Sequence, residues 1–462
     1  MPAITPPSAF MRNMAPVELE VDLRAIPVSG RLPPELNGTL LRIGPNPLFP
    51  SEGAHWFAGD GMVHAFHLAE GRVRYRNRWV RTERWLAQRE ARRALPGGLA
   101  DTAADNGVAN TNIERHAGRL LALEEAHLPV ALRMDGLETL GSVDLDGGIA
   151  GPFTAHPKTD PDSGQLLFFG YGTPDWLGPG MRFGVLDAAG RVERFDAFEA
   201  PYASMVHDFA VTANHAVFPV QPLTASRARL RAGGPAFAWE AERECALGVL
   251  PRAAPVDELA WWSLPPCYVY HVMNAWEEGH CLRIDVMQSG AAALFPRPDG
   301  TPVADAGGAR LSRWTIDLDD PQRRAQSELL CEIRGEFPRI DERRSGRPYR
   351  HGWFIGHAPD GQGTAGSARP FSRVVHIDHV RPYAPDVYML DDGDACSEAV
   401  FVPRAPDAPE GDGWLLAVAY RGASGKSELL VFDACEVAAG PLAVAALPVR
   451  VPNGFHGNWM PA

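Results

Sequence analysis

The sequence predicts an all-β fold, and more specifically a β-propeller. Short apolar runs bounded by Gly, Pro, Asp or Asn recur along the chain, for example at 166–169, 282–286, 414–418 and 429–432. At 462 residues, the chain is too long for an ordinary single layered domain. Radial repetition of small sheets can extend a β protein without one oversized core, which favours a propeller over a sandwich. No clear sequence repeat fixes the number of blades.

One hairpin and two helices can be placed on this background. Alternating runs at 62–66 and 73–80 flank Glu70-Gly71, a turn signal that predicts a hairpin. Residues 83–95 are the best helical candidate, and a second lies near 224–230. We expect both helices to be insertions over one face of the propeller. No long flexible linker is evident, so residues 1–462 are predicted to form a single domain.

The beginning of the chain is expected to be an extended arm laid over the body. Prolines punctuate it up to about Asn46, and the arm proper is expected over about residues 1–31. This segment has no apolar core of the kind a signal peptide needs, and no apolar span is long enough for a bilayer. The sequence therefore predicts a soluble, cytoplasmic protein without a transmembrane segment.

Charge and cysteine content exclude several classes of function. Lys and Arg number 44 against 57 Asp and Glu, a formal net charge of -13, which leaves no basic surface for nucleic acid. The six cysteines are scattered without a CxxC pair, as is typical of a reducing compartment. Zinc knuckles and disulfide scaffolds are therefore not expected.

Four histidines lie beside apolar residues. His207 lies in the run 205–212, which reads as a buried strand, and His156, His271 and His456 have comparable surroundings far apart in the sequence. A buried neutral imidazole must satisfy both ring nitrogens, either by hydrogen bonds within the core or by binding a metal. The pattern alone leaves both interpretations open, because fifteen histidines could supply four such contexts by packing.

Several motifs together carry a family resemblance. They are 42–47 (RIGPNP), 55–64 (HWFAGDGMVH), 109–112 (ANTN), 336–340 (EFPRI) and the four histidine contexts. In this order, from about Leu32 to Trp459, the chain resembles the carotenoid cleavage oxygenase family, which includes carotenoid, apocarotenoid, lignostilbene and isoeugenol oxygenases. The resemblance implies a seven-bladed propeller with Fe(II) on its axis, held by one histidine from each of four blades.

The matching positions for the iron ligands are His156, His207, His271 and His456. Four neutral imidazoles would hold a ferrous ion and leave open positions for O2. The resemblance also implies three glutamates that accept hydrogen bonds from these histidines, and a threonine close to the open iron position. The glutamates match Glu125, Glu336 and Glu398, although Ala399 replaces the usual proline after the last; the threonine matches Thr111. Loss of the final few residues is expected to empty the iron site and leave most of the propeller intact.

The implied reaction is cleavage of a conjugated C=C bond by O2 into two carbonyl products, with no separate acid–base residue. The resemblance implies that lignostilbene and isoeugenol oxygenases bind the phenol oxygen of the substrate with a lysine and a loop tyrosine. In this sequence Glu124 occupies the lysine position, and the loop 96–108 contains no tyrosine. A carboxylate would repel a phenolate, so the sequence favours an apocarotenoid or carotenoid over stilbenoids and isoeugenol-type phenylpropenes. Aromatic residues expected to line an apolar tunnel are Trp56, Phe57, Trp79, Trp276 and Phe455.

Two other kinds of propeller are alternatives to this hypothesis. A non-catalytic binding platform would have no use for His456, and a calcium-dependent lactonase-type propeller would place Asp, Glu and Asn on the axis. The expected partners are therefore a small apolar alkene and O2, without nucleic acid. The oligomeric state does not follow from the sequence.

Overall fold

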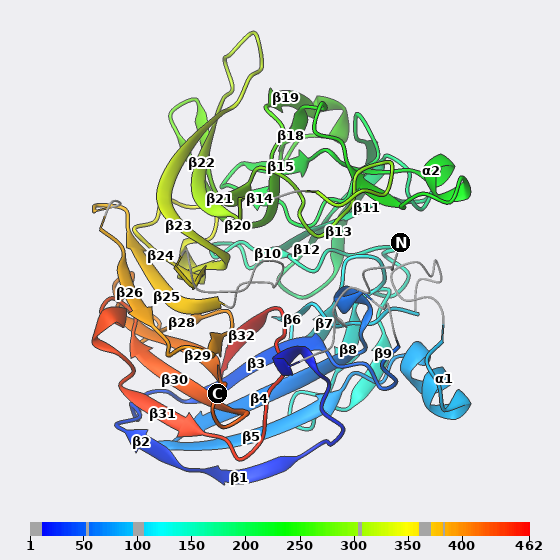
Figure 1. Ribbon diagram of the computed structural model, residues 1–462. Coiled ribbons are helices and arrows are strands. Elements are labelled where there is room, and N and C mark those ends of the chain that lie inside the picture. Colours follow the sequence, from blue (N-terminus) through cyan, green and yellow to red (C-terminus); the bar gives the residue numbers. More distant parts are fainter. Residues whose placement is uncertain (1–11, 52–54, 96–105, 304–306, 360–370, 382–383) are drawn as a thin grey trace. The chain divides into compact units, whose positions relative to one another are not determined.

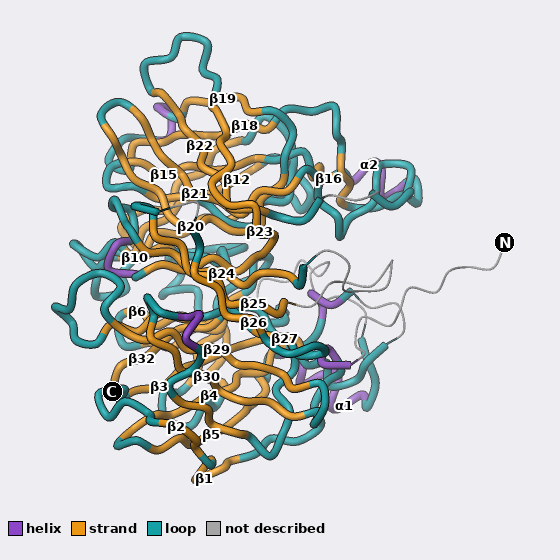
Figure 2. The backbone as a smooth tube through the Cα atoms, turned by 60° about the vertical axis from the view of Figure 1, so that its left-hand side comes forward, coloured by secondary structure: helices purple, strands orange, loops and turns teal. Residues whose placement is uncertain are grey.

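The computed structural model describes residues 12–51, 55–95, 106–303, 307–359, 371–381 and 384–462. Strands make up most of the regular structure and the helices are short, as Figures 1 and 2 show. Internal contacts divide the chain into two compact units. Unit 1 comprises Met1–Ala155, Ala358–His376 and Asp386–Ala462, and unit 2 comprises His156–His357 and Ile377–Pro385.

Within its described residues, unit 1 is built from antiparallel sheets. The strand order of one is β1-β5-β4-β3-β32, so the last strand of the chain pairs with β3 near its beginning (Figure 1). Another is β6-β7-β8-β9, and a third is β2-β31-β30-β29-β27, in which β28 also pairs with β29; β25 pairs with β26. The bounds are β1 Asp22–Ile26, β2 Val28–Gly30, β3 Gly38–Pro45, β4 Gly61–Ala69, β5 Arg72–Trp79, β6 Asn112–His116, β7 Arg119–Leu123, β8 Val130–Leu132, β9 Thr139–Ser142, β25 Phe371–Asp378, β26 Asp386–Met389, β27 Ala395–Cys396, β28 Val400–Pro403, β29 Gly413–Arg421, β30 Lys426–Asp433, β31 Ala443–Ala446 and β32 Gly457–Pro461.

The described part of unit 2 contains the sheets β10-β11-β12-β13 and β14-β15-β18-β19, the pair β16-β17 and the run β20-β21-β22-β23-β24. The long strand β23 pairs with β22 along its first part and with β24 along its second. The bounds are β10 Lys158–Thr159, β11 Leu166–Tyr171, β12 Gly180–Leu186, β13 Val192–Glu199, β14 Ala210–Val211, β15 His215–Val220, β16 Leu223–Ala225, β17 Phe237–Trp239, β18 Cys245–Pro251, β19 Ala260–Leu264, β20 Tyr268–Glu278, β21 Cys281–Ser289, β22 Arg310–Asp317, β23 Gln326–Ile340 and β24 His351–His357.

The predicted hairpin and both predicted helices are present. Strands β4 and β5 turn at Glu70 and Gly71, which have positive φ angles of 52° and 69°. Helix α1 spans Glu83–Ala91 and begins at Thr82, whose side chain accepts a hydrogen bond from the N–H of Trp85. Helix α2 spans Arg227–Arg231, because the first predicted residues, near 224, pair in β16 instead. The 3₁₀ turns are Arg12–Met14, Trp56–Ala58, Val256–Glu258, Glu342–Arg344 and Val437–Ala439.

The expected N-terminal arm is shorter than the prolines suggest. Strand β3 is not part of an arm, because it lies inside a sheet, paired on one side with β4 and on the other with β32. Before it, β1 and β2 extend the edges of two different sheets of unit 1. Residues 1–11 of the expected arm lie outside the described residues.

Each unit has apolar cores between its own sheets. In unit 1, Phe66 and Trp414 belong to one buried cluster, and in unit 2, Phe183 and Phe218 belong to another. Each of the six cysteines is free. Among the described helices, none combines the length and the apolar character needed to cross a bilayer.

Candidate metal centre

Three of the four predicted ligands come together within unit 2. His156 precedes β10, His207 precedes β14 and His271 lies in β20. Their ring centroids are 4.7 to 5.3 Å apart, and each ring offers a nitrogen within 4.8 Å of the other two. The Nε2 atoms of His156 and His207 are 3.1 Å apart. Residues separated by more than a hundred positions thus converge on one point.

His207 does not lie in a buried strand, as the sequence predicted. The described strand β14 contains only Ala210 and Val211, and His207 itself is half-buried in the extended segment before it. The carboxylate of Asp208 accepts the N–H of Phe209 at 2.8 Å, so this backbone donor is bonded to a side chain. His207 is therefore carried by a segment outside the regular sheet.

The second ring nitrogen of His271 is held by Glu336, as the family resemblance implies. The Nδ1 of His271 lies 2.7 Å from Oε2 of Glu336 in β23. A proton on Nδ1 fixes the tautomer and leaves the Nε2 lone pair available to a metal. Burial raises the pKa of Glu336 well above its ordinary range; the N–H of Phe337 opposes this shift and the negative charge of Asp208 adds to it. Burial therefore disfavours the charged form of Glu336.

The fourth predicted ligand, His456, lies in unit 1 with its own glutamate. Its Nδ1 is 2.9 Å from Oε1 of Glu398, whose Oε2 accepts the N–H of Gly457 at 2.8 Å. The N–H of His456 donates to the carbonyl of Thr111 at 3.1 Å, so the predicted threonine is a direct backbone neighbour. The Thr111 hydroxyl donates to Oδ1 of Asn110 at 2.9 Å. His456 thus has the same arrangement as His271, with Nδ1 held by a carboxylate.

Glu125 and Glu124 lie just after β7 and are both buried, with 7% and 2% of their surface exposed. Glu124 bonds to His127 through Oε1, and its Oε2 accepts the N–H of Ala126 at 2.9 Å. The side chains of Glu124 and His127 are each 1% exposed. The carboxylate of Glu124 is therefore already hydrogen-bonded within the protein. The sequence argument for repulsion of a phenolate by this carboxylate is correspondingly weaker.

Three of the predicted lining residues form one aromatic cluster in unit 1. The ring centroid of Phe455 lies 4.4 Å from that of Trp56 and 5.5 Å from that of Phe57. Phe455 directly precedes His456, and the cluster is only partly closed, because Trp56 and Phe57 are half-buried. These three side chains can offer an apolar surface next to a candidate ligand.

The other two predicted lining residues pack within the body of the sheets. The indole N–H of Trp79 donates to the carbonyl of Asn46 at 2.8 Å, and its ring belongs to a small core cluster. Trp276 packs edge-on against Tyr349 at 5.6 Å, and the guanidinium of Arg313 lies 4.7 Å from its ring centre. Both side chains have buried partners that account for their positions.

Sequence reasoning missed two charged residues beside the histidines, Lys158 and Asp208, which form an ion pair 2.8 Å long. A signal was present, because Lys158 follows His156 by two positions and Asp208 follows His207 directly. A charged side chain next to a candidate ligand is most often solvated, so this spacing carried no weight without the structure.

The donor set suits a transition metal. Imidazole nitrogens bind iron, copper, nickel and zinc, and carboxylates that hold the opposite ring nitrogens are the usual outer partners of such ligands. The carboxylates of Glu336 and Glu398 are engaged by Nδ1 atoms, so the nitrogens that remain for a metal are neutral donors. Such a site retains the positive charge of the bound ion.

Comparisons with known proteins decide the family. The family model described as retinal pigment epithelial membrane protein matches residues 14–461. The chain belongs to the carotenoid cleavage oxygenase family. It is 37% identical to an isoeugenol monooxygenase of Pseudomonas nitroreducens, with 97% of each chain covered. It also resembles the crystal structure of a Pseudomonas brassicacearum lignostilbene dioxygenase, with a TM-score of 0.94, 35% identity and 99% of each chain covered. An apocarotenoid oxygenase of Synechocystis matches with a TM-score of 0.85, 26% identity and coverage of 99% of this chain and 100% of that one.

Membership of the carotenoid cleavage oxygenase family confirms two predictions. The fold is the seven-bladed β-propeller that the resemblance implied. The protein is an oxidoreductase that cleaves alkenes in the manner of this family.

Proposed function

We propose that this protein is a non-haem Fe(II) oxygenase whose iron is held by His156, His207, His271 and His456. The observation that carries the proposal is the convergence of the first three imidazoles, with ring centroids 4.7 to 5.3 Å apart. His456 is proposed as the fourth ligand because its Nδ1 is held by Glu398 as that of His271 is held by Glu336. When bound, the ferrous ion supplies the activation of O2.

Glu125 is proposed to accept a hydrogen bond from the outer ring nitrogen of one of the ligand histidines. The support for this is its burial at the end of β7, beside Glu124, in a position that matches the family motif. Thr111 is proposed to restrict access to the open iron position, which is supported by its backbone contact with His456. These residues position the ligands and limit water; none of them is needed as an acid or base.

The substrate class that the observations favour is an aryl alkene, of the stilbene or phenylpropene type. One molecule of O2 adds across its conjugated C=C bond, which breaks to give two carbonyl compounds, and this balances all atoms. Two observations support this class. The isoeugenol and lignostilbene enzymes match over nearly the whole chain at 35% to 37% identity. Both oxygens of Glu124 also already have hydrogen-bond partners in His127 and Ala126, which leaves the carboxylate less available to repel a phenolate.

An apocarotenoid remains the second candidate substrate, and a specific observation favours it. Glu124 stands where phenol-binding relatives have lysine, so the cation that would attract a phenolate is replaced by a carboxylate that already has partners. The cluster of Trp56, Phe57 and Phe455 would suit a long apolar polyene.

The test combines metal content with a substrate panel. Purified protein is expected to contain about one iron per chain and to consume one O2 per alkene cleaved, with products identified by mass. His207→Ala is expected to lose iron and turnover, whereas His67→Gln, which alters a histidine bonded to Thr39, is expected to retain both. Full activity in His207→Ala, or stoichiometric zinc or calcium in place of iron, would overturn the proposal. Faster cleavage of apocarotenals than of 4-hydroxystilbenes would select the second substrate class.

A further inference from the structure

Asp208 is a nearly fully buried carboxylate in the middle of unit 2, with 3% of its surface exposed. Its Oδ1 lies 2.8 Å from the Nζ of Lys158 and accepts the N–H of Phe209 at 2.8 Å. Its Oδ2 accepts the N–H of Val272, also at 2.8 Å. One side chain therefore joins three segments that are remote in the sequence.

Each of these segments carries one of the three convergent histidines. Lys158 follows His156 by two residues, Asp208 follows His207 directly, and Val272 follows His271 directly. We propose that Asp208 is a positioning residue for the metal centre, whose carboxylate fixes the three histidine segments of unit 2 relative to one another. The proposal rests on the iron site proposed above, and it assigns to Asp208 no contact with the metal or the substrate.

The local backbone explains why the three histidine segments need hydrogen bonds from a side chain. The pairing of β20 with β21 is irregular between Val269 and Val272, so His271 sits where the regular ladder is interrupted. His156 and His207 lie outside strands altogether. Sheet hydrogen bonds therefore do not fix these three segments at the ligands themselves, and the bonds to Asp208 take their place.

Only an ionised carboxylate satisfies all the donors around Asp208. The ammonium of Lys158 and two backbone N–H groups point at the two carboxylate oxygens. An asparagine side chain of the same shape has only one acceptor oxygen, and its NH₂ group would face a donor. A buried charge is costly unless it is paired and hydrogen-bonded, and this one is both. The chemistry at the position is therefore specific for aspartate.

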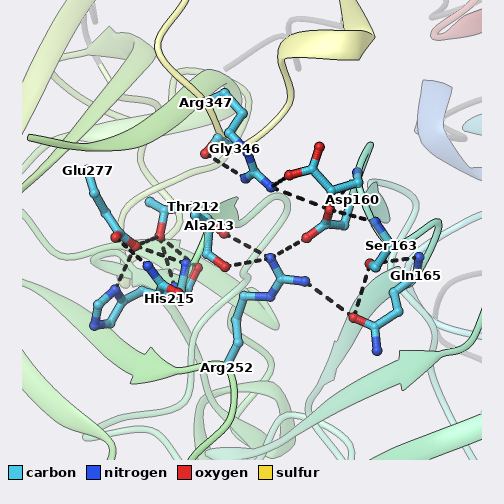
Figure 3. A network of polar contacts seen from close by, with 12 residues as sticks. Asp160, Ser163, Gln165, Thr212, Ala213, His215, Arg252, Glu277, Gly346 and Arg347 are labelled. Atoms are coloured by element: carbon cyan, nitrogen blue, oxygen red, sulfur yellow. Dashed lines mark hydrogen bonds and ion pairs between the residues drawn. The ribbon is translucent and has the colours of Figure 1, made fainter.

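A second set of polar contacts links residues that lie further along the same three segments of the sequence (Figure 3). Arg252 binds Asp160, four residues after His156, at 2.6 Å, and donates to the carbonyls of Thr212 and Ala213. Glu277 of β20 accepts hydrogen bonds from the Thr212 hydroxyl and from the N–H of Asn214, the latter at 2.9 Å. This outer set stabilises the fold of the segments. Asp208 acts at the residues next to the ligands.

The test is the affinity for Fe(II), measured by chelator competition under anaerobic conditions, in Asp208→Asn and Lys158→Met. Loss of an outer partner of a metal ligand typically costs 10- to 100-fold in metal affinity, and we expect about that loss for Asp208→Asn. Lys158→Met is expected to lose less, because the bonds of Asp208 to Phe209 and Val272 persist. Lys158→Arg, which preserves the ion pair, is expected to restore the affinity of the unaltered protein.

The matched control is Asp378→Asn. Asp378 is buried, and its two oxygens accept hydrogen bonds from the guanidinium of Arg350 at 2.8 and 2.7 Å. We expect this variant to be destabilised, with an unchanged affinity for Fe(II) and an unchanged rise in the thermal midpoint on adding the metal. Asp208→Asn should show a smaller rise.

Equal Fe(II) affinity in Asp208→Asn and the unaltered protein would overturn the positioning role and leave the proposed iron site standing. If Asp208→Asn does not fold, the two Lys158 variants provide the test. Equal affinities of Lys158→Met and Lys158→Arg for Fe(II) would then overturn the positioning role of Asp208. Absence of Fe(II) binding by the unaltered protein would overturn the proposed iron site together with this inference.

Discussion

Nδ1 of His456 lies 2.9 Å from Oε1 of Glu398, and the other oxygen of the same carboxylate accepts the N–H of Gly457 at 2.8 Å. One buried side chain thereby fixes both the tautomer of the imidazole and the backbone that carries it. In unit 2, the corresponding tasks are divided, because Glu336 holds the ring of His271 while Asp208 holds the backbone next to it. This difference makes Glu398 the more sensitive of the two glutamates.

Glu398→Gln is therefore expected to weaken Fe(II) binding by about 10- to 100-fold. The amide oxygen can accept from either His456 or Gly457, and the NH₂ group then faces the other donor. Chelator competition measures the effect, and Glu436→Gln, which alters a glutamate outside this site, serves as the control. Fully retained iron affinity in Glu398→Gln would contradict the role assigned to this hydrogen bond.

Loss of the C-terminus is expected to affect more than the iron site. Strand β32 pairs with β3 from Gly457, opposite Arg42, to Pro461, opposite Gly38. Ending the chain after His456 should expose β3 and lower the thermal midpoint, whereas His456→Ala should lose iron with the sheet intact. Thermal unfolding of the two metal-free proteins measures the difference. Equal midpoints would show that β32 adds nothing to stability.

Glu277 predicts a pH dependence of stability. Burial opposes its ionisation, but hydrogen bonds from Thr212, His215 and Asn214 outweigh this and lower its pKa to about 2. Because the folded-state pKa lies below the ordinary value of 4.5, the stabilisation is present above about pH 4.5 and is lost as the pH falls toward 2. The shift corresponds to at most about 3 kcal/mol, and we expect about half of this after solvent screening.

Denaturant unfolding of Glu277→Gln from pH 7 to pH 3 tests this expectation. The variant should be less stable than the unaltered protein at pH 7, and the gap should narrow as the pH falls below 4.5. Glu278→Gln is the matched control. Glu278 is the exposed neighbour of Glu277, and its carboxylate pairs with Arg283. A gap that stays constant with pH would assign the effect of Glu277 to packing.

Much of the fold followed from local sequence signals, because those signals act over a few residues. The turn at Glu70-Gly71 and the start of α1 at Glu83 depend on neighbouring residues, and both were predicted. The pairing of β3 with β32 could not be predicted in this way, because the two strands lie near opposite ends of the chain. Pairing across such a separation leaves no trace in local periodicity.

Some residues of the candidate site could be predicted from the sequence and others could not. Family motifs indicated the histidines and glutamates, and His271 with Glu336 and His456 with Glu398 do form hydrogen-bonded pairs. The role of Asp208 could not be predicted, since it depends on the N–H of Val272, a backbone group that any residue could supply. The partner of Glu124 was also hidden, although His127 is only three positions away, because nothing in the sequence requires the two side chains to be buried together.

The pairing of Glu124 with His127 gives a prediction about both stability and substrate. Replacing Glu124 with lysine would place an ammonium among donors, next to His127 and the N–H of Ala126. We expect Glu124→Lys to lower the free energy of unfolding by about 3 to 5 kcal/mol, the usual effect of breaking a buried pair. Glu138→Lys, at an exposed ion pair with Arg133, should change it by about 1 kcal/mol or less. Urea unfolding measures both variants. A stable Glu124→Lys that cleaves hydroxystilbenes faster would instead mean that the carboxylate faces the substrate and repels it, and that the buried pair is dispensable.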